Sequence, residues 1–362
     1  MELNHRICIL VHSLHAGGME RVVTELIHQF SHKKEAEIHL ILYGIKRDIF
    51  YQLPQNIKIH KPNFEFNNNL RLISTIRTFY SVRKIITKIN PTTILSFGEI
   101  WNSFVLISLL GKSYPVYITD RCQPNKSLGK INDFLRIILY PKATGIIAQT
   151  ETAKEIYFEQ FKHKNIIVIG NPIRKIEPIE FVLKENIVLS VGRLINSKHH
   201  DELIKLFVSL NKPKWKLIIV GDDAIKQQNM VRLKTLITEL NADEQVFLAG
   251  KQTDVDSYYL RSKIFAFTSS SEGFPNVIGE AQSAGLPVVA FDCIAGPSDL
   301  IQNEQNGFLI PLFNYQMFAT KLNLMMEDAE LAESMGSRAK QSVQKFESNI
   351  ISEKFYQFIT SN

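Results

Sequence analysis

The segment "SSSEGFPNVIGEAQSAGLPVVAFD" at 269–292 contains two carboxylates, Glu272 and Glu280, separated by seven residues. Glu272 lies in a loop rich in Ser, Gly and Pro, whereas Glu280 lies in an apolar-periodic stretch that predicts a helix beginning near Asn276. Pro275 suits the first helical position, and free amides at a helix start attract phosphate. Because a carboxylate accepts separately from two neighbouring hydroxyls, the segment indicates a site for a phosphorylated sugar. Its alternative is a helix-start acid followed by a surface acid.

A second group of candidate residues lies in "SVGRLINSKHHDELIKLF" at 190–207. A strand runs into Gly192, which permits a tight exit because it lacks a Cβ. Arg193 and Lys198 follow and precede an amphipathic helix. A guanidinium fork and an ammonium can together hold a diphosphate. Two solvated loop cations would produce the same pattern.

The rest of the chain alternates short β-branched runs with helical patterns, which is typical of parallel sheets joined by crossover helices. The Pro-rich stretch 169–180 is expected to be the linker between two such halves. The sequence predicts an α/β architecture in which ligands bind beyond the carboxyl ends of the strands, in a cleft between the halves. The expected strands are 6–13, 37–43, 92–97, 115–120 and 144–150, then 186–192, 215–221, 246–250, 263–269 and 287–292.

Composition is that of a globular protein, with 362 residues, 45% of them hydrophobic and 22% charged. Three cysteines without metal-like spacing predict reduced thiols, and the absence of a signal or a membrane-spanning stretch predicts a cytoplasmic protein. The net charge of +6 is uneven, since residues 1–170 contain 22 Lys and Arg against 13 Asp and Glu. A basic half can meet anionic lipid or nucleic acid, but no nucleic-acid motif accompanies it.

Residues 180–311 resemble the retaining glycosyltransferases of family 4, whose GT-B fold has two Rossmann-like, doubly wound domains facing a central cleft. The resemblance rests on the Glu272-to-Glu280 spacing and on several further motifs. These motifs are "VGRL" with Lys198, "VGDD" at 220–223, "LAGKQTDVDSYYLRS" at 248–262, "GPSDLI" at 296–301 and "NGFLIP" at 306–311. We expect an N-terminal acceptor domain at 1–170, a nucleotide-sugar domain at 171–345, and a helix at 346–362 packing back on the first domain.

This resemblance implies transfer of a hexose or N-acetylhexosamine from a nucleoside-diphosphate sugar, with UDP the commoner nucleotide. It also implies retention of configuration and no metal or other cofactor. The sequence agrees with the expectation that no metal is needed, because "DD" at 222–223 is not an Asp-x-Asp metal motif. The alternatives are a nucleotide-sugar epimerase on the same fold or a non-catalytic relative. A dehydrogenase is disfavoured because no GxGxxG follows the first strand.

By position, the resemblance assigns Arg193 and Lys198 to the donor diphosphate, Glu272 to the donor sugar and Glu280 to the ribose. His199 stands where relatives often carry Gly. The other donor-site residues expected are Gly17, Gly18, Gly192, Lys251, Gly273, Phe274, Pro275 and Asn276.

In the first half, Gly17 and Gly18 lie between a strand and a helix, as in a phosphate-binding loop or an ordinary turn. Acceptor-site candidates follow two other strands: Glu99 and Asn102 after one, Asp120 and Arg121 after the next. Asp120 is also the candidate for proton handling, although pairing with Arg121 is an equal alternative. Relatives that act on lipid-linked oligosaccharides place an acid before His or Arg here, and Arg121 stands where a subset has His.

The stretch 70–90 predicts a helix with Leu72, Ile76, Phe79 and Ile86 on one face and basic residues on another. It suits either an amphipathic helix on anionic lipid or an ordinary crossover helix. The basic half favours an acceptor on a polyprenyl diphosphate carrier at the inner face of the cytoplasmic membrane. The expected role is therefore in bacterial surface polysaccharide or glycan biosynthesis.

Overall fold

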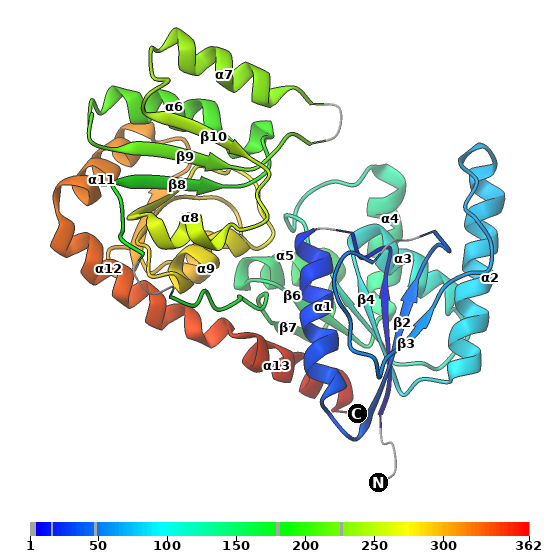
Figure 1. Ribbon diagram of the computed structural model, residues 1–362. Helices are drawn as coiled ribbons and strands as arrows, with labels where there is room; N and C mark the ends of the chain where they lie inside the picture. Colours follow the sequence, from blue (N-terminus) through cyan, green and yellow to red (C-terminus); the bar gives the residue numbers. More distant parts are fainter. Residues whose placement is uncertain (1–4, 16, 47–48, 179–181, 225–226, 362) are drawn as a thin grey trace. The chain divides into compact units, whose positions relative to one another are not determined.

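A computed structural model describes residues 5–15, 17–46, 49–178, 182–224 and 227–361. The chain forms two compact units, each considered separately below (Figure 1). Unit 1 contains Met1–Pro172 and Ser348–Asn362, and unit 2 contains Ile173–Glu347. The last helix therefore belongs to the same unit as the first strand.

Unit 1 is built on a seven-stranded parallel sheet with the order β3-β2-β1-β4-β5-β6-β7, flanked by helices. Its strands are β1 (His5–Val11), β2 (Ala36–Leu42), β3 (Lys58–His60), β4 (Thr93–Phe97), β5 (Val116–Thr119), β6 (Gly145–Ala148) and β7 (Ile166–Val168). Its helices are α1 (Gly18–Ser31), α2 (Arg71–Ile89), α3 (Glu99–Ser108), α4 (Lys130–Leu139), α5 (Glu151–Phe161) and α13 (Ser348–Thr360), with 3₁₀ turns η1 (Asn68–Leu70) and η2 (Tyr140–Lys142).

The central strands of unit 1 are continuous apolar runs because helices cover both faces of a parallel sheet. Ile7 through Val11 of β1 are fully buried. Helix α13 packs against α1, where Lys33 Nζ lies 2.8 Å from Glu353 Oε2 and the Ser348 hydroxyl donates to Glu25 at 2.9 Å. These contacts hold the C-terminal segment to unit 1.

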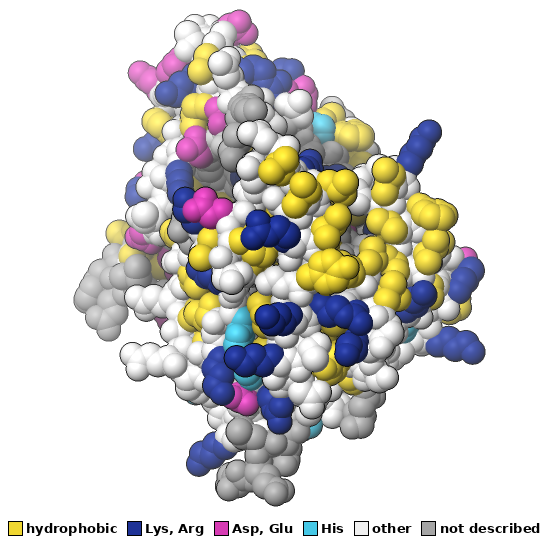
Figure 2. Space-filling model, turned by 90° about the vertical axis from the view of Figure 1, so that its right-hand side faces the viewer, with side chains coloured by type: hydrophobic (Ala, Val, Ile, Leu, Met, Phe, Trp, Pro, Cys, Tyr) yellow, Lys and Arg dark blue, Asp and Glu magenta, His cyan; other side chains and the backbone are white. Residues whose placement is uncertain are grey.

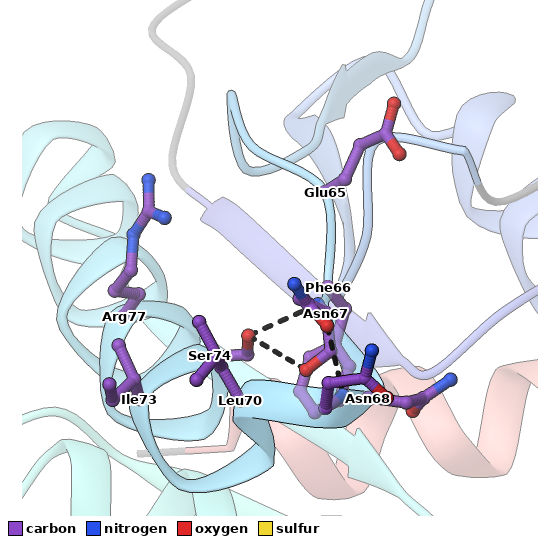
Figure 3. Close-up of a pocket in the computed structure, with 9 residues that line it drawn as sticks. Glu65, Phe66, Asn67, Asn68, Leu70, Ile73, Ser74 and Arg77 are labelled. Carbon is purple, nitrogen blue, oxygen red and sulfur yellow. Dashed lines mark hydrogen bonds between the residues drawn. The ribbon is translucent and has the colours of Figure 1, made fainter.

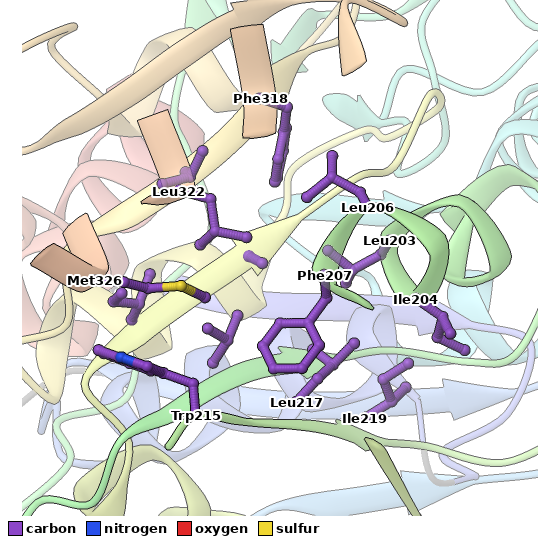
Figure 4. Close-up of a cluster of buried hydrophobic side chains, with 14 of the residues drawn as sticks. Leu203, Ile204, Leu206, Phe207, Trp215, Leu217, Ile219, Phe318, Leu322 and Met326 are labelled. Carbon is purple, nitrogen blue, oxygen red and sulfur yellow. The ribbon is translucent and has the colours of Figure 1, made fainter. Parts of the chain in front are cut away.

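Unit 2 repeats the architecture with a six-stranded parallel sheet, in the order β10-β9-β8-β11-β12-β13. Trp215, Phe207 and Phe318 belong to its main buried cluster, in which helices pack against the sheet (Figure 4). The strands are β8 (Ile187–Val191), β9 (Lys216–Val220), β10 (Val246–Gly250), β11 (Ile264–Phe267), β12 (Val288–Asp292) and β13 (Gly307–Pro311). The helices are η3 (Asn196–Lys198), α6 (His200–Ser209), α7 (Asn229–Glu239), α8 (Asp256–Arg261), α9 (Asn276–Ser283), α10 (Pro297–Leu300), α11 (Tyr315–Glu327), α12 (Ala329–Ser342) and η4 (Val343–Phe346).

All ten strands expected from the sequence are confirmed, and three short edge strands, β3, β7 and β13, were not predicted. The described part of the linker, 169–178, contains no helix or strand, yet it is not a solvated tether. Ile173 and Ile176 are buried in unit 2. Ile173 packs where α9 has Gly279, since an added Cβ on Gly279 would lie 2.6 Å from Ile173 Cδ1.

Helix α2 forms where it was expected, but most of its predicted apolar face does not pack inward, as the crossover-helix alternative requires. Leu72 and Ile76 are 74% and 47% exposed, and only Ile86 of the expected face is fully buried. The buried face consists of Ser74, Thr78, Val82, Ile86 and Ile89. Small hydroxyl residues pack at the N-terminal half of α2, so its larger aliphatic residues face outward. Across the described residues, no helix combines the length and the apolar character that crossing a bilayer demands.

Candidate active site

In unit 2 the order in which the chain adds strands to the sheet reverses between β8 and β11. From β8 the chain continues outward to β9 and β10, and it resumes on the other side of β8 with β11. Loops that follow two such neighbouring strands diverge and leave a crevice at their carboxyl ends. Lys198 follows β8 and Glu272 follows β11, so the topology brings together residues 74 positions apart.

Hydrogen bonds tie the loop after β8 to the loop after β11. The Thr268 hydroxyl donates to the Lys198 carbonyl at 2.7 Å, and the Ser270 amide donates to the Ser197 carbonyl at 2.8 Å. His199 Nε2 lies 2.8 Å from Ser270 Oγ. His199 adopts a left-handed φ of 50°, which glycine takes without strain, so the glycine expected at this position in relatives has a conformational reason.

Gly192 and Gly221 allow the ends of β8 and β9 to approach closely. An added Cβ on Gly221 would lie 1.8 Å from the Gly192 carbonyl oxygen, and Gly221 has a φ of 151°. On the other side of Gly192, an added Cβ would lie 3.3 Å from Lys198 Cε. The two glycines therefore position the backbone beneath the Lys198 side chain.

Lys198 and Glu272 form an ion pair with 2.5 Å between Nζ and Oε1, and their side chains are only 16% and 15% exposed. The Lys198 ammonium also lies 5.1 Å from the centroid of the Phe267 ring. Arg193, by contrast, is exposed, and its side chain makes no hydrogen bond or ion pair with the described residues. The site thus contains one cation already neutralised by a carboxylate and a second that is open to an anion.

Helix α9 begins at Asn276, as expected, but Pro275 is the capping residue before the helix and not its first residue. The amides of Asn276 and Ile278 donate to the carbonyls of Phe274 and Pro275 at 3.0 and 2.9 Å. The expectation that the helix start offers free amides is therefore wrong for these two. Local turns satisfy them because the helix opens in a tight bend.

A close contact fixes the position of this bend. Gly296, with a φ of 102°, lies against Pro275, and an added Cβ there would lie 2.2 Å from Pro275 Cδ. Phe274 is buried and packs edge-on against Phe346. The Gly-Phe-Pro segment after Glu272 is thus held from two sides, which restricts where the Glu272 backbone can move.

Glu280 lies on α9 and is only 4% exposed. The Tyr259 hydroxyl donates to its Oε2 at 3.0 Å, and Arg174 Nε lies 3.5 Å from its Oε1. Arg174 also pairs with Asp256; burial lowers the pKa of Arg174, but the two carboxylates raise it above its usual value overall. Ribose binding by Glu280 stays a prediction. Sequence reasoning missed Arg174, which lies in the linker, and Tyr259, which lies in the motif at 248–262 but was not singled out there.

The remaining residues at this edge of unit 2 are less enclosed. Lys251 is exposed directly after β10. Asp223 accepts from the amides of Asn229 and Met230 at the start of α7, which gives the "DD" turn a capping role. No group of three or more metal-ligating side chains occurs in the ranges that the structure describes.

In unit 1, Gly17 caps α1 and Gly18 is its first residue. The Gly17 amide donates to the Tyr51 hydroxyl at 3.1 Å, and that hydroxyl donates to the Gly17 carbonyl at 2.9 Å. An added Cβ on Gly17 would lie 2.3 Å from Glu20 Oε2. Burial raises the pKa of the Glu20 carboxyl. A carboxylate already lies beside the helix start where the sequence predicted a phosphate.

Asp120 is 2% exposed and pairs with Arg136, not with Arg121 as the alternative interpretation expected. Arg136 Nη2 donates to Asp120 Oδ2 at 2.7 Å, and the Tyr140 hydroxyl and Asn102 Nδ2 donate to Oδ1 at 2.7 and 2.9 Å. Three donors therefore enclose this carboxylate. Asp120 and Asn102 therefore share a buried hydrogen-bond network, and their roles in acceptor binding or proton handling stay predictions.

Glu99 and Arg121 are organised differently. Glu99 Oε1 accepts from the amides of Arg121 and Cys122 at 2.6 and 2.5 Å, and so holds the turn after β5. Arg121 Nη1 donates to Asn171 Oδ1 at 2.5 Å. The Arg121 guanidinium lies near the rings of Phe97 and Phe355. Burial lowers the pKa of Arg121 to about 10, so it remains charged at neutral pH. Nε and Nη2 of Arg121 have no hydrogen-bond partner among the described residues.

Comparison with known proteins agrees with this geometry. The family model for glycosyl transferases group 1 matches residues 173–342. A relative from Campylobacter jejuni, named N-acetylgalactosamine-N,N'-diacetylbacillosaminyl-diphospho-undecaprenol 4-alpha-N-acetylgalactosaminyltransferase, is 30% identical over 359 residues, which are 94% of this chain and 95% of the relative. The amylovoran biosynthesis glycosyltransferase AmsD of Erwinia amylovora is 24% identical over 97% of this chain and 98% of its own.

Among solved structures, Anabaena HepE in complex with UDP superposes with a TM-score of 0.82 over 99% of this chain and all of the other, at 20% identity. This likeness confirms the GT-B fold of two Rossmann-like domains. The similarity to the Campylobacter jejuni enzyme over 94% of this chain favours a glycosyltransferase over the isomerase and the non-catalytic alternatives. The chain belongs to the group 1 glycosyltransferases and is a glycosyltransferase enzyme.

Proposed function

We propose that the protein transfers a hexose or N-acetylhexosamine from a UDP-sugar to a glycan carried on a polyprenyl diphosphate. The observation that carries the proposal is the Lys198–Glu272 pair, which lies where the strand order of unit 2 reverses. It places an ammonium for a diphosphate and a carboxylate for sugar hydroxyls side by side. The acceptor is proposed because the Campylobacter jejuni relative is named for an undecaprenol-linked substrate, and UDP because HepE binds it.

In this proposal Arg193 and Lys198 stabilise the diphosphate as negative charge develops on it. The bond between the anomeric carbon and the β-phosphate oxygen breaks, and the acceptor oxygen forms the new glycosidic bond on the same face. The acceptor proton passes to the departing diphosphate, and configuration is retained. Glu272 binds the donor sugar, Glu280 the ribose, and no metal takes part.

The acceptor would place the enzyme at the inner face of the cytoplasmic membrane, in the synthesis of a bacterial surface glycan. In unit 1, Arg121 is the acceptor candidate that we single out, since it is charged and two of its nitrogen atoms lack a partner in the described chain. We expect Arg121→Gln to raise the KM for the acceptor while the affinity for UDP is unchanged. Near-normal acceptor kinetics would remove Arg121 from the site.

A panel of UDP-, GDP- and ADP-sugars tests the donor, because a tightly bound donor raises the unfolding temperature by mass action. The stabilising donor is then incubated with a polyprenyl-diphosphate-linked oligosaccharide, with and without EDTA, and the anomeric configuration of the product is read by NMR. We expect EDTA-resistant transfer and a product with the donor configuration. Inversion, or transfer that EDTA abolishes, would contradict the mechanism but not the family.

A further inference from the structure

Helix α4 of unit 1 exposes several large apolar residues and buries an arginine, although Leu139 packs in the core. Ile131, Phe134 and Ile137 are 76%, 61% and 55% exposed, whereas Arg136 is 5% exposed. A surface helix normally buries its apolar stripe and exposes its charges. Here Arg136 is held inside by Asp120, so the apolar residues of α4 face solvent. An apolar patch kept outward by a buried ion pair calls for an apolar partner.

Helix α2 extends the same pattern. Leu72, Ile73, Ile76 and Tyr80 are all exposed, while Ser74 and Thr78 on the opposite face are buried. Helix α3 contacts both α2 and α4, so the two helices flank it on one side of unit 1. Figure 2 shows hydrophobic side chains gathered on the face that carries α2, with Lys and Arg side chains beside them. We call the exposed residues 72, 73, 76, 80, 131, 134, 137 and 138 the α2–α4 surface.

The charges around the α2–α4 surface are mostly positive. Residues 66–98 contain five Lys and Arg and no Asp or Glu. The exposed cations on or next to the two helices are Arg71, Arg77, Lys84, Lys88, Lys126 and Lys130. Two acids lie nearby: Asp133 of α4, which accepts from the Ser127 hydroxyl and the Leu128 amide, and Glu65, which pairs with Lys46. The exposed aliphatic and aromatic side chains can contact the acyl chains of a bilayer, while the cations around them can bind its anionic headgroups.

A hollow of about 560 Å³ at the N-terminal end of α2 marks where this surface turns polar (Figure 3). Asn67 and Arg77 line it beside Leu70 and Ile73. The Ser74 hydroxyl donates to the Asn67 carbonyl at 3.2 Å and accepts from its amide at 3.1 Å, which fixes the loop. Polar and apolar groups therefore meet at this end of α2, as they do at the headgroup boundary of a bilayer.

We infer that the α2–α4 surface docks on an anionic phospholipid bilayer, with Ile131 and Phe134 in the boundary between headgroups and acyl chains. A second copy of the chain is a poorer partner, because joining two copies through this surface would bring like-charged rims together. The inference gives the proposed lipid-linked acceptor a physical route to the enzyme. Docking can be measured without any sugar nucleotide, so its failure would leave the transferase function standing.

The test is flotation of the full chain with vesicles of phosphatidylcholine, with and without phosphatidylglycerol. We expect the chain to float only with the anionic vesicles, and less of it as salt increases. Ile131→Ser with Phe134→Ser should lower the partition coefficient at least about tenfold, because two large apolar side chains no longer enter the bilayer. Leu183→Ser with Val231→Ser is the matched control, since these residues of unit 2 are 84% and 64% exposed.

Thermal stabilisation by UDP should be the same in both double variants and the wild type, which shows that each is folded. Wild-type protein that stays with the soluble fraction, or an α4 variant that floats like the control, would overturn the inference. So would a wild-type dimer that the α4 variant converts to a monomer without any lipid binding, because the surface would then join two copies.

Discussion

Replacing Glu272 by Gln should affect UDP binding and sugar transfer in opposite directions. In the structure Lys198 Nζ lies 2.5 Å from Glu272 Oε1, and both side chains are largely shielded from water. A diphosphate that approaches Lys198 must therefore compete with a carboxylate of the same charge sign as its own. Glutamine keeps the size and one oxygen but removes this competition, so UDP alone should bind more tightly.

The magnitude follows from the exposure of the pair. Ion pairs near the surface contribute up to about 1 kcal/mol. Because UDP does not have to break this pair in the glutamine variant, its Kd there should be roughly fivefold lower. Lys198→Met has the reverse effect, because a charge-assisted hydrogen bond of about 1.5–3 kcal/mol is lost. The Kd of UDP should then rise by roughly tenfold to a hundredfold. Turnover with the intact donor should fall in both variants.

Isothermal titration calorimetry with UDP measures these changes directly. Glu327→Gln is the matched control, since Lys212 and Glu327 form a pair with the same 2.5 Å separation on another part of unit 2. This control should leave the Kd of UDP unchanged. If Glu272→Gln weakens UDP binding as much as Lys198→Met does, the carboxylate does not compete with the diphosphate. If Lys198→Met leaves the Kd of UDP unchanged, the assignment of Lys198 to the diphosphate is wrong.

Three further predictions concern stability. Gly221→Ala should lower the unfolding temperature by several degrees and weaken UDP binding, because its Cβ would displace the Gly192 carbonyl; an unchanged melting curve would contradict this. Arg136→Met should cost about 3–5 kcal/mol in chemical denaturation, since the Asp120 carboxylate stays buried without its partner; unaltered stability with lost activity would instead support a catalytic role for Asp120. Burial lowers the pKa of His200 to about 3 from its usual 6.5, so the unfolded chain takes up the proton first as pH falls below 6.5. By pH 5 the resulting loss of stability is about 2 kcal/mol, and His200→Gln should flatten this pH dependence in denaturant titrations.

Much of unit 2 was predictable because its signals are local. Helices cover both faces of a parallel sheet, so each central strand is apolar along its whole length. An apolar run between turn residues in the sequence therefore marks the position of a strand. The start of α9 at Asn276 follows from the loop-breaking Gly-Phe-Pro segment. The meeting of Lys198 and Glu272 follows from the doubly wound order of strands, which the alternation of strand and helix patterns already indicated.

Other features have no local signal. The edge strands β3 and β7 have three residues each, too few to show a pattern. Helical periodicity shows that α2 is amphipathic in composition, but it does not tell which face meets the sheet. In α2 the smaller Ser74 and Thr78 pack inward, which turned the predicted face outward.

By itself the sequence determined the α/β class, the ten main strands, and a loop pair that carries Lys198 and Glu272. Only the tertiary structure decided that Asp120 pairs with Arg136, sixteen residues further along the chain, and not with its neighbour Arg121. The reason is geometric, because adjacent residues at a strand end point in different directions while a neighbouring helix can reach in. That one buried pair also keeps Arg136 inside and leaves Ile131 and Phe134 of α4 exposed.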